Sequence, residues 1–167
     1  MIEINESNMI FGPFEEEHIF HIEQSELYRL AGEKVKTVEF LYSRNFDAIS
    51  FIEAKSSSKK MTDDVLIGSN EFINSVSEKF LHSFSLYCAA LLGRRESSND
   101  IPEKLRKIDL SQAAINFFLV IHGHREEWLP PVREALLKKL KPHLQIWNLK
   151  IFVLNDMGAQ KYHLVKS

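Results

Sequence analysis

The length, composition and charge of this 167-residue chain exclude several classes of protein. A content of 44% hydrophobic and 26% charged residues is typical of a globular protein, and a net charge of −2 provides no overall basic field to attract nucleic acid. The single cysteine, Cys88, excludes an intrachain disulfide and a cysteine-based zinc cluster. The acidic N-terminus does not resemble a signal peptide, and the longest apolar run, residues 115–121, is too short to span a bilayer. We therefore expect one domain over residues 1–167, located in the cytoplasm, with no membrane partner.

The N-terminal segment predicts short elements. Residues 1–14 alternate loosely between apolar and polar and end in Phe-Gly-Pro-Phe, which predicts a strand near residues 8–11 followed by a turn. Apolar residues predict a second strand over residues 19–22. Ser25 then predicts the start of a helical turn, which Gly32 ends.

Residues 36–58 predict a β-hairpin, because two apolar, aromatic runs flank a segment rich in turn-forming residues. Side chains alternate along a strand, so Glu53 and Lys55 share a face. With a three-residue loop over residues 45–47, Glu39 on the first strand lies directly opposite Glu53; a two-residue loop would turn Glu39 to the other face. Opposed carboxylates are destabilising unless one keeps its proton or a cation lies between them.

Two converging carboxylates beside a lysine form an oxygen-rich site that suits Mg²⁺ or Mn²⁺. A metal ion there could polarise a phosphoryl oxygen and activate a water, while the lysine neutralises developing charge. This is the chemistry of phosphodiester hydrolysis. A Glu-x-Lys pattern also occurs on charged edge strands, but the flanking apolar runs favour a central strand.

The Glu-Ala-Lys triplet at residues 53–55 resembles the acid-x-Lys half of the PD-(D/E)xK nuclease superfamily, which includes the restriction endonucleases. The phrases FHIEQSELY, VEFLY and FIEAKSSS also resemble segments of a group of small bacterial proteins. The superfamily has an acidic residue on the preceding strand, and Glu39 matches it in position, with glutamate in place of the usual aspartate. Many members carry a further glutamate nearer the N-terminus, for which Glu23 is the best match and Glu26 the second.

The resemblance implies a restriction-endonuclease-like fold, a small mixed sheet flanked by helices. It implies that Glu39, Glu53 and Glu23 hold Mg²⁺ or Mn²⁺, and that Lys55 assists the attacking water. In the polar loop that follows, Lys59 and Lys60 lie near this site and could contact phosphate; the alternative is a plain solvated loop.

The rest of the chain predicts alternating helices and strands. An apolar residue at every fourth position predicts a helix over residues 71–92, with Ser69 or Asn70 as its cap and Gly93 at its end. Cys88 lies on the apolar stripe of this helix and is predicted to be a small buried hydrophobe. His122 and His124 could bind zinc or phosphate, but without a third ligand they favour a turn at a strand end. The further predicted elements are a strand at 113–121, a helix from Pro130–Pro131, a strand at 149–154, a turn at 155–158 and a terminal strand at 162–165.

The order hairpin, helix, strand, helix, strand implies parallel pairing, and hence an α/β fold with a mixed central sheet, a core hairpin and flanking helices. The first functional hypothesis is a metal-dependent nuclease acting on DNA rather than RNA. The second is a catalytically inactive binding or regulatory module on the same fold, acting through a protein partner. A third is a subunit active only in a homodimer or larger assembly.

Overall fold

The computed structural model describes residues 1–57, 67–95 and 99–166. The predicted phosphate contacts Lys59 and Lys60 lie outside these residues. None of the helices in the described part of the chain is long and apolar enough to cross a membrane.

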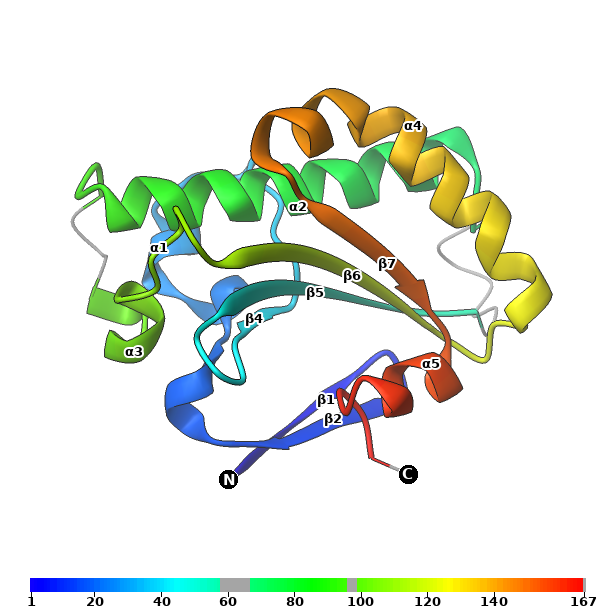
Figure 1. Ribbon diagram of the computed structural model, residues 1–167, viewed down its shortest axis with the longest axis horizontal. Coiled ribbons are helices and arrows are strands. Elements are labelled where there is room, and N and C mark those ends of the chain that lie inside the picture. The colour runs from blue at the N-terminus through cyan, green and yellow to red at the C-terminus, as the bar shows by residue number, and fades with distance from the viewer. Residues whose placement is uncertain (58–66, 96–98, 167) are drawn as a thin grey trace.

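A five-stranded mixed sheet forms the centre of the molecule, in the order β3-β4-β5-β6-β7 (Figure 1). The pairs β3–β4 and β4–β5 are antiparallel, and the pairs β5–β6 and β6–β7 are parallel. The predicted α/β class with a mixed central sheet is therefore confirmed. The strands of this sheet are β3 (Ile19–Phe20), β4 (Phe40–Tyr42), β5 (Ala48–Ser56), β6 (Ala114–His122) and β7 (Lys150–Leu154).

Helices α2 (Asn70–Leu91) and α4 (Leu129–Trp147) cover one face of the sheet, and the hairpin of β1 (Ile2–Glu6) and β2 (Met9–Phe14) lies on the other with α5 (Asp156–Lys161) (Figure 1). Because both faces are covered, successive side chains of the central strands enter different cores. Phe51 and Phe117 pack on the α2 side, whereas Ile52 and Phe118 pack on the hairpin side. The shorter elements are η1 (Glu16–His18), η2 (Ile22–Gln24), α1 (Glu26–Arg29), α3 (Glu103–Arg106) and η4 (Glu126–Trp128).

The long predicted elements are confirmed. The Ser69 hydroxyl caps α2 by accepting from the Phe72 N–H, and Gly93, with φ +66°, follows its end. Helix α4 has proline in its first turn, where the missing N–H costs nothing.

Two predicted turns are wrong. The Phe-Gly-Pro-Phe segment lies within β2, and the chain turns instead at Ser7 and Asn8, whose positive φ angles (50° and 64°) build a two-residue hairpin turn. Residues 155–158 begin helix α5, because the Asn155 side chain accepts from the Gly158 N–H and caps it. In place of the predicted strand at 162–165, the described residues form an isolated bridge between Phe11 and Val165.

The register of the β4–β5 hairpin agrees with the three-residue loop. Phe40 lies opposite Ile52, and Leu41 lies opposite Phe51. The paired register ends at Phe40 and Ile52; Glu39 directly precedes β4, and its N–H donates to the Ile52 carbonyl at 3.1 Å, next to Glu53. Lys79 of α2 contacts the carboxylates of both Glu39 and Glu53, so both reach the sheet face that α2 covers.

The segment before Glu39 is fastened to α2. The Val38 N–H donates to the Ser83 hydroxyl at 2.9 Å in a buried position, and the Lys36 N–H donates to His82 Nδ1 at 3.1 Å. Lys36 also forms an ion pair with Glu78. These contacts fix the position of residues 36–38 along α2, and therefore the position of the neighbouring Glu39.

Replacing Ser83 by alanine should lower the free energy of unfolding by about 1–3 kcal/mol, because the buried Val38 N–H loses its acceptor. Chemical denaturation measures this change. Ser85→Ala, an exposed position on the same helix, is the matched control and should change stability by less than about 0.5 kcal/mol. Equal effects of the two substitutions would contradict the role given to Ser83.

Candidate functional site

A buried carboxylate marks the candidate site. Glu53, in the second half of β5, has a side chain that is 0% exposed. Its Oε1 atom lies 2.7 Å from Lys55 Nζ and 2.9 Å from Lys79 Nζ, and its Oε2 atom accepts a hydrogen bond from Lys79 at 3.2 Å. Both contacts at Oε1 are ion pairs, because their distances are short but their angles are not those of a hydrogen bond. Two ammonium groups therefore neutralise the buried charge of Glu53.

Lys79 lies between the two predicted acids. Its ammonium nitrogen is 3.7 Å from Glu39 Oε1, while Glu39 is only 10% exposed. Lys79 comes from α2 and was not predicted. The missed signal is its place on the apolar stripe of that helix, three residues after Val76 and four before Ser83, both of which are buried. A charge on a buried stripe needs a partner, and here the partner is the acid pair.

Two further carboxyl groups approach from the N-terminal region. Glu23, on η2, forms a side-chain hydrogen bond with Glu39, so the structure brings together all four predicted residues, Glu23, Glu39, Glu53 and Lys55. Glu6, at the end of β1, was not predicted. Burial raises its pKa, and the charges of Glu23 and Glu53 raise it further.

The second-choice residue Glu26 does not join this cluster. Its carboxylate forms an ion pair with Arg29 on its own helix, at 3.1 Å. Glu23 is therefore the N-terminal glutamate that the fold brings to the site.

Burial and neighbouring charges shift the pKa values of the groups at the site. Burial raises the pKa of Glu39 to about 8; the hydrogen bond that protonated Glu39 donates to Glu23, and the charge of Glu53, act in the same direction. Burial lowers the pKa of Lys79, but the charges of Glu53 and Glu39 outweigh this effect and raise the pKa overall. Near neutral pH Glu39 therefore keeps a proton and Lys79 keeps its charge.

The side chains of the site offer the type of donor atom that a hard divalent cation takes. Carboxylate oxygens are the ligands that Mg²⁺ and Mn²⁺ prefer, whereas the proton on Glu39 is a consequence of its burial first and of its neighbours second. Glu23, Glu39 and Glu53 do not bring their ligand oxygens within 4.8 Å of one another as the structure stands; among the described residues, Glu15, Glu17 and His18 meet that spacing. The ammonium of Lys79 lies beside Glu39 and Glu53 instead.

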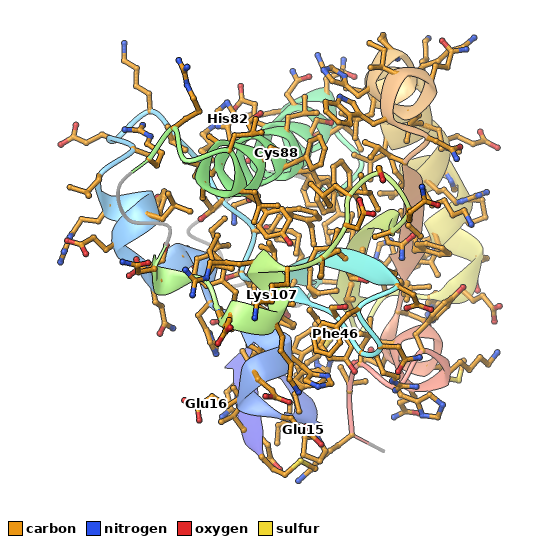
Figure 2. All side chains as sticks on the ribbon, turned by 60° about the vertical axis from the view of Figure 1, so that its left-hand side comes forward. Glu15, Glu16, Phe46, His82, Cys88 and Lys107 are labelled. Atoms are coloured by element: carbon orange, nitrogen blue, oxygen red, sulfur yellow. The ribbon has the colours of Figure 1, made fainter. Side chains whose placement is uncertain are left out.

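The cluster of Glu15, Glu17 and His18 is peripheral. Figure 2 shows Glu15 at the far end of the molecule from His82 and Cys88 on α2, and both glutamates of the cluster are exposed. Exposed acidic groups are common on protein surfaces, so we assign it no ligand. Cys88 is half-buried, and burial raises the pKa of its thiol to about 11, as expected for an unreactive cysteine.

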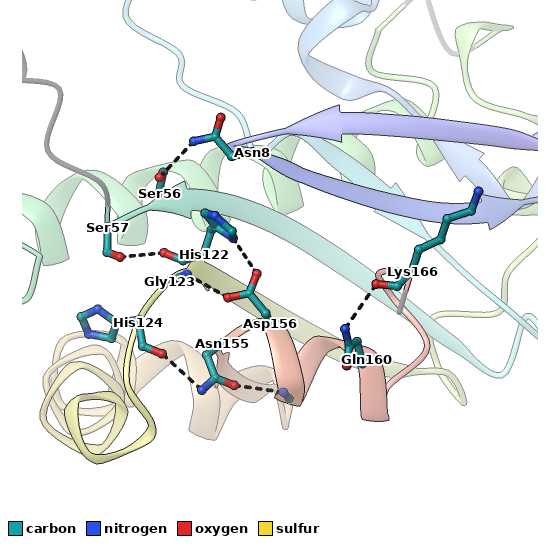
Figure 3. A network of polar contacts seen from close by, with 11 residues as sticks. Asn8, Ser56, Ser57, His122, Gly123, His124, Asn155, Asp156, Gln160 and Lys166 are labelled. Carbon is teal, nitrogen blue, oxygen red and sulfur yellow. Dashed lines mark hydrogen bonds and ion pairs between the residues drawn. The ribbon is translucent and has the colours of Figure 1, made fainter.

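A second polar network lies on the opposite face of the sheet, where β5, β6 and β7 end (Figure 3). The Asp156 carboxylate contacts His122 Nδ1 at 2.6 Å and accepts the Gly123 N–H at 2.8 Å. The Asn155 amide donates to the His124 carbonyl. His122 and His124 thus flank a strand-end turn, with Gly123 at φ +70°, which is the turn that the sequence predicted.

Comparison of the chain with protein-family models, with curated proteins and with solved structures found no significant match.

The raised pKa of Glu39 makes stability depend on pH. A carboxyl whose pKa is higher in the folded than in the unfolded state binds its proton more tightly when folded, so its contribution is complete below pH 4.5 and is lost as the pH rises towards 8. Thermal and urea unfolding between pH 5 and 9 should therefore show a loss on the order of a few kcal/mol in the wild type. Glu39→Gln, which cannot titrate, should flatten this dependence. An equally steep dependence in Glu39→Gln would contradict the assignment.

Proposed function

We propose that this protein is a metal-dependent nuclease with a restriction-endonuclease-like fold, hydrolysing phosphodiester bonds at the site formed by Glu39, Glu53 and Lys55. The observation that carries the proposal is the convergence of these three side chains with Glu23, from separate chain segments, around one buried carboxylate. Such a concentration of buried charge is costly for a structure and is typical of functional sites.

The order of the elements supports the same proposal. An antiparallel hairpin followed by helix α2 and the parallel strand β6 is the kind of mixed, helix-flanked sheet that the resemblance implies. The Glu-x-Lys triplet lies on β5, which pairs with a strand on each side and is therefore not a charged edge.

In the proposed mechanism, Glu39 and Glu53 would hold Mg²⁺ or Mn²⁺, and Glu23 would complete the set of ligands. When bound, the ion supplies Lewis-acid stabilisation and an activated water. To act as a ligand, Glu39 would first release its proton to solvent, leaving a carboxylate. Lys55, at 34% exposure the more accessible lysine, orients the attacking water and neutralises charge on the phosphate.

The substrate in this proposal is DNA in preference to RNA, and the enzyme works in the cytoplasm, alone or as a homodimer or larger assembly. The net charge of −2 supplies no long-range attraction, so affinity has to come from local contacts. Lys55 is one such contact. Lys59 and Lys60 remain proposed contacts with the phosphate backbone.

A second candidate function is a binding or regulatory module that uses the same fold without catalysis. The observation that favours it is the ion pair between Lys79 and Glu53, which neutralises the buried carboxylate without any metal ion. A protein partner, rather than nucleic acid, would then be the ligand.

The nuclease proposal predicts cleavage of plasmid or single-stranded DNA that requires Mg²⁺ or Mn²⁺. Glu53→Gln removes a charged ligand and Lys55→Met removes the neutralising ammonium, so each should lower the cleavage rate by at least about 100-fold. Rates from gel assays across a metal titration measure this effect.

Glu78→Gln is the matched control, because Glu78 precedes Lys79 on α2 but pairs with the exposed Lys36, and it should keep the wild-type rate. Circular dichroism verifies that each variant is folded. Cleavage that survives both site substitutions would remove the proposed activity from this site.

A further inference from the structure

The ammonium group of Lys79 lies where a bound cation would bridge the two acids. It is 2.9 Å from Glu53 Oε1 and 3.7 Å from Glu39 Oε1. Lys55 also contacts Glu53, at 2.7 Å, but no ion pair joins Lys55 to Glu39 among the described residues. Lys79 is therefore the lysine that contacts both members of the acid pair.

This contact satisfies the two acids unequally. Charge-assisted N–H···O bonds are about 2.7–2.9 Å long, so Glu53 has a good partner in Lys79, whereas Glu39 at 3.7 Å has a weak one. A divalent ion binds carboxylate oxygens at about 2.0–2.1 Å for Mg²⁺ and carries twice the charge of an ammonium group. Once Glu39 has lost its proton, such an ion would therefore compensate the two carboxylates more fully than Lys79 does.

The Lys79 ammonium group can move away from the acid pair. Its side chain is 17% exposed, and the long flexible stem of a lysine allows the ammonium to move without moving α2. Glu6, at the end of β1, is close enough for electrostatic interaction with Lys79 and offers a second carboxylate. The exchange therefore leaves the ammonium near negative charge.

We propose that Lys79 is the resident counter-cation of the Glu39–Glu53 pair, and that a divalent cation binds this site by displacing its ammonium group. The inference rests on the function proposed for the site. Lys79 holds the acids together and keeps the fold stable while the metal is absent, and it sets how much metal is needed for occupancy. The affinity of the site is thus limited by a competitor built into the protein.

Titration calorimetry with Mn²⁺ tests the proposal on wild-type protein, Lys79→Met and Lys36→Met. Lys36→Met is the matched control, because it removes a lysine that contacts α2 but does not touch the acid pair. Lys79→Met should bind Mn²⁺ at least tenfold more tightly than the wild type, and its melting temperature should be lower without Mn²⁺ and rise more when Mn²⁺ is added. Lys36→Met should bind like the wild type.

The outcomes separate this inference from the proposed function. Equal or weaker binding by Lys79→Met, with measurable binding by the wild type, overturns the displacement and leaves the nuclease proposal standing. Binding by Lys79→Met alone supports the displacement and contradicts a metal-dependent wild-type enzyme. Absence of binding in both proteins overturns both proposals.

A second measurement needs no variant. Amine-reactive labelling of the wild type, read by mass spectrometry, should show Lys79 becoming several-fold more reactive in saturating Mn²⁺, while Lys36 stays unchanged as an internal reference. Unchanged or reduced labelling of Lys79, with Mn²⁺ bound by calorimetry, would overturn the proposal even if Lys79→Met fails to fold.

Discussion

The buried carboxylate of Glu53 is the constraint on which the site depends. An ion removed from water costs several kcal/mol unless its charge is compensated at close range. Glu53 has no exposed surface, and its compensation comes from Lys55 on the same strand and Lys79 on α2. Helix α2 therefore packs an apolar face against the sheet and also brings a positive charge to Glu53. Its position along β5 is fixed in part by this ion pair.

The location of the site follows from the layers of the fold. Both faces of the central strands are covered, so most of their length admits only apolar side chains. Polar groups gather where β5, β6 and β7 approach their carboxyl ends, and strand alternation divides them between the faces. Glu53 and Lys55 face α2, whereas His122 and Asp156 meet on the hairpin side. In open α/β sheets this end of the strands is the usual place for ligands.

The acids at the site oppose stability and favour ligand binding. Glu39 holds a proton at neutral pH because it is buried and because Glu23 and Glu53 lie beside it. The same grouping of acidic side chains is what would attract a divalent cation. Residues that destabilise a fold in this way are common at functional sites. We therefore prefer the proposed hydrolytic function to the alternative that these charges only keep the protein surface polar.

Local chemistry in the chain was enough to predict the helices and strands with long periodic patterns, and the register of the β4–β5 hairpin, which brings Glu39 near Glu53. Both depend on neighbours in sequence: side-chain spacing selects the buried face, and turn length selects the pairing. The cap at Asn155 and the turn at Ser7 and Asn8 were missed because their short polar signals compete with equally plausible alternatives nearby. Lys79 and Glu6 became site residues only when α2 and the β1–β2 hairpin packed against the sheet. No local pattern specifies which distant segments will meet, since that choice is made by the burial of whole faces.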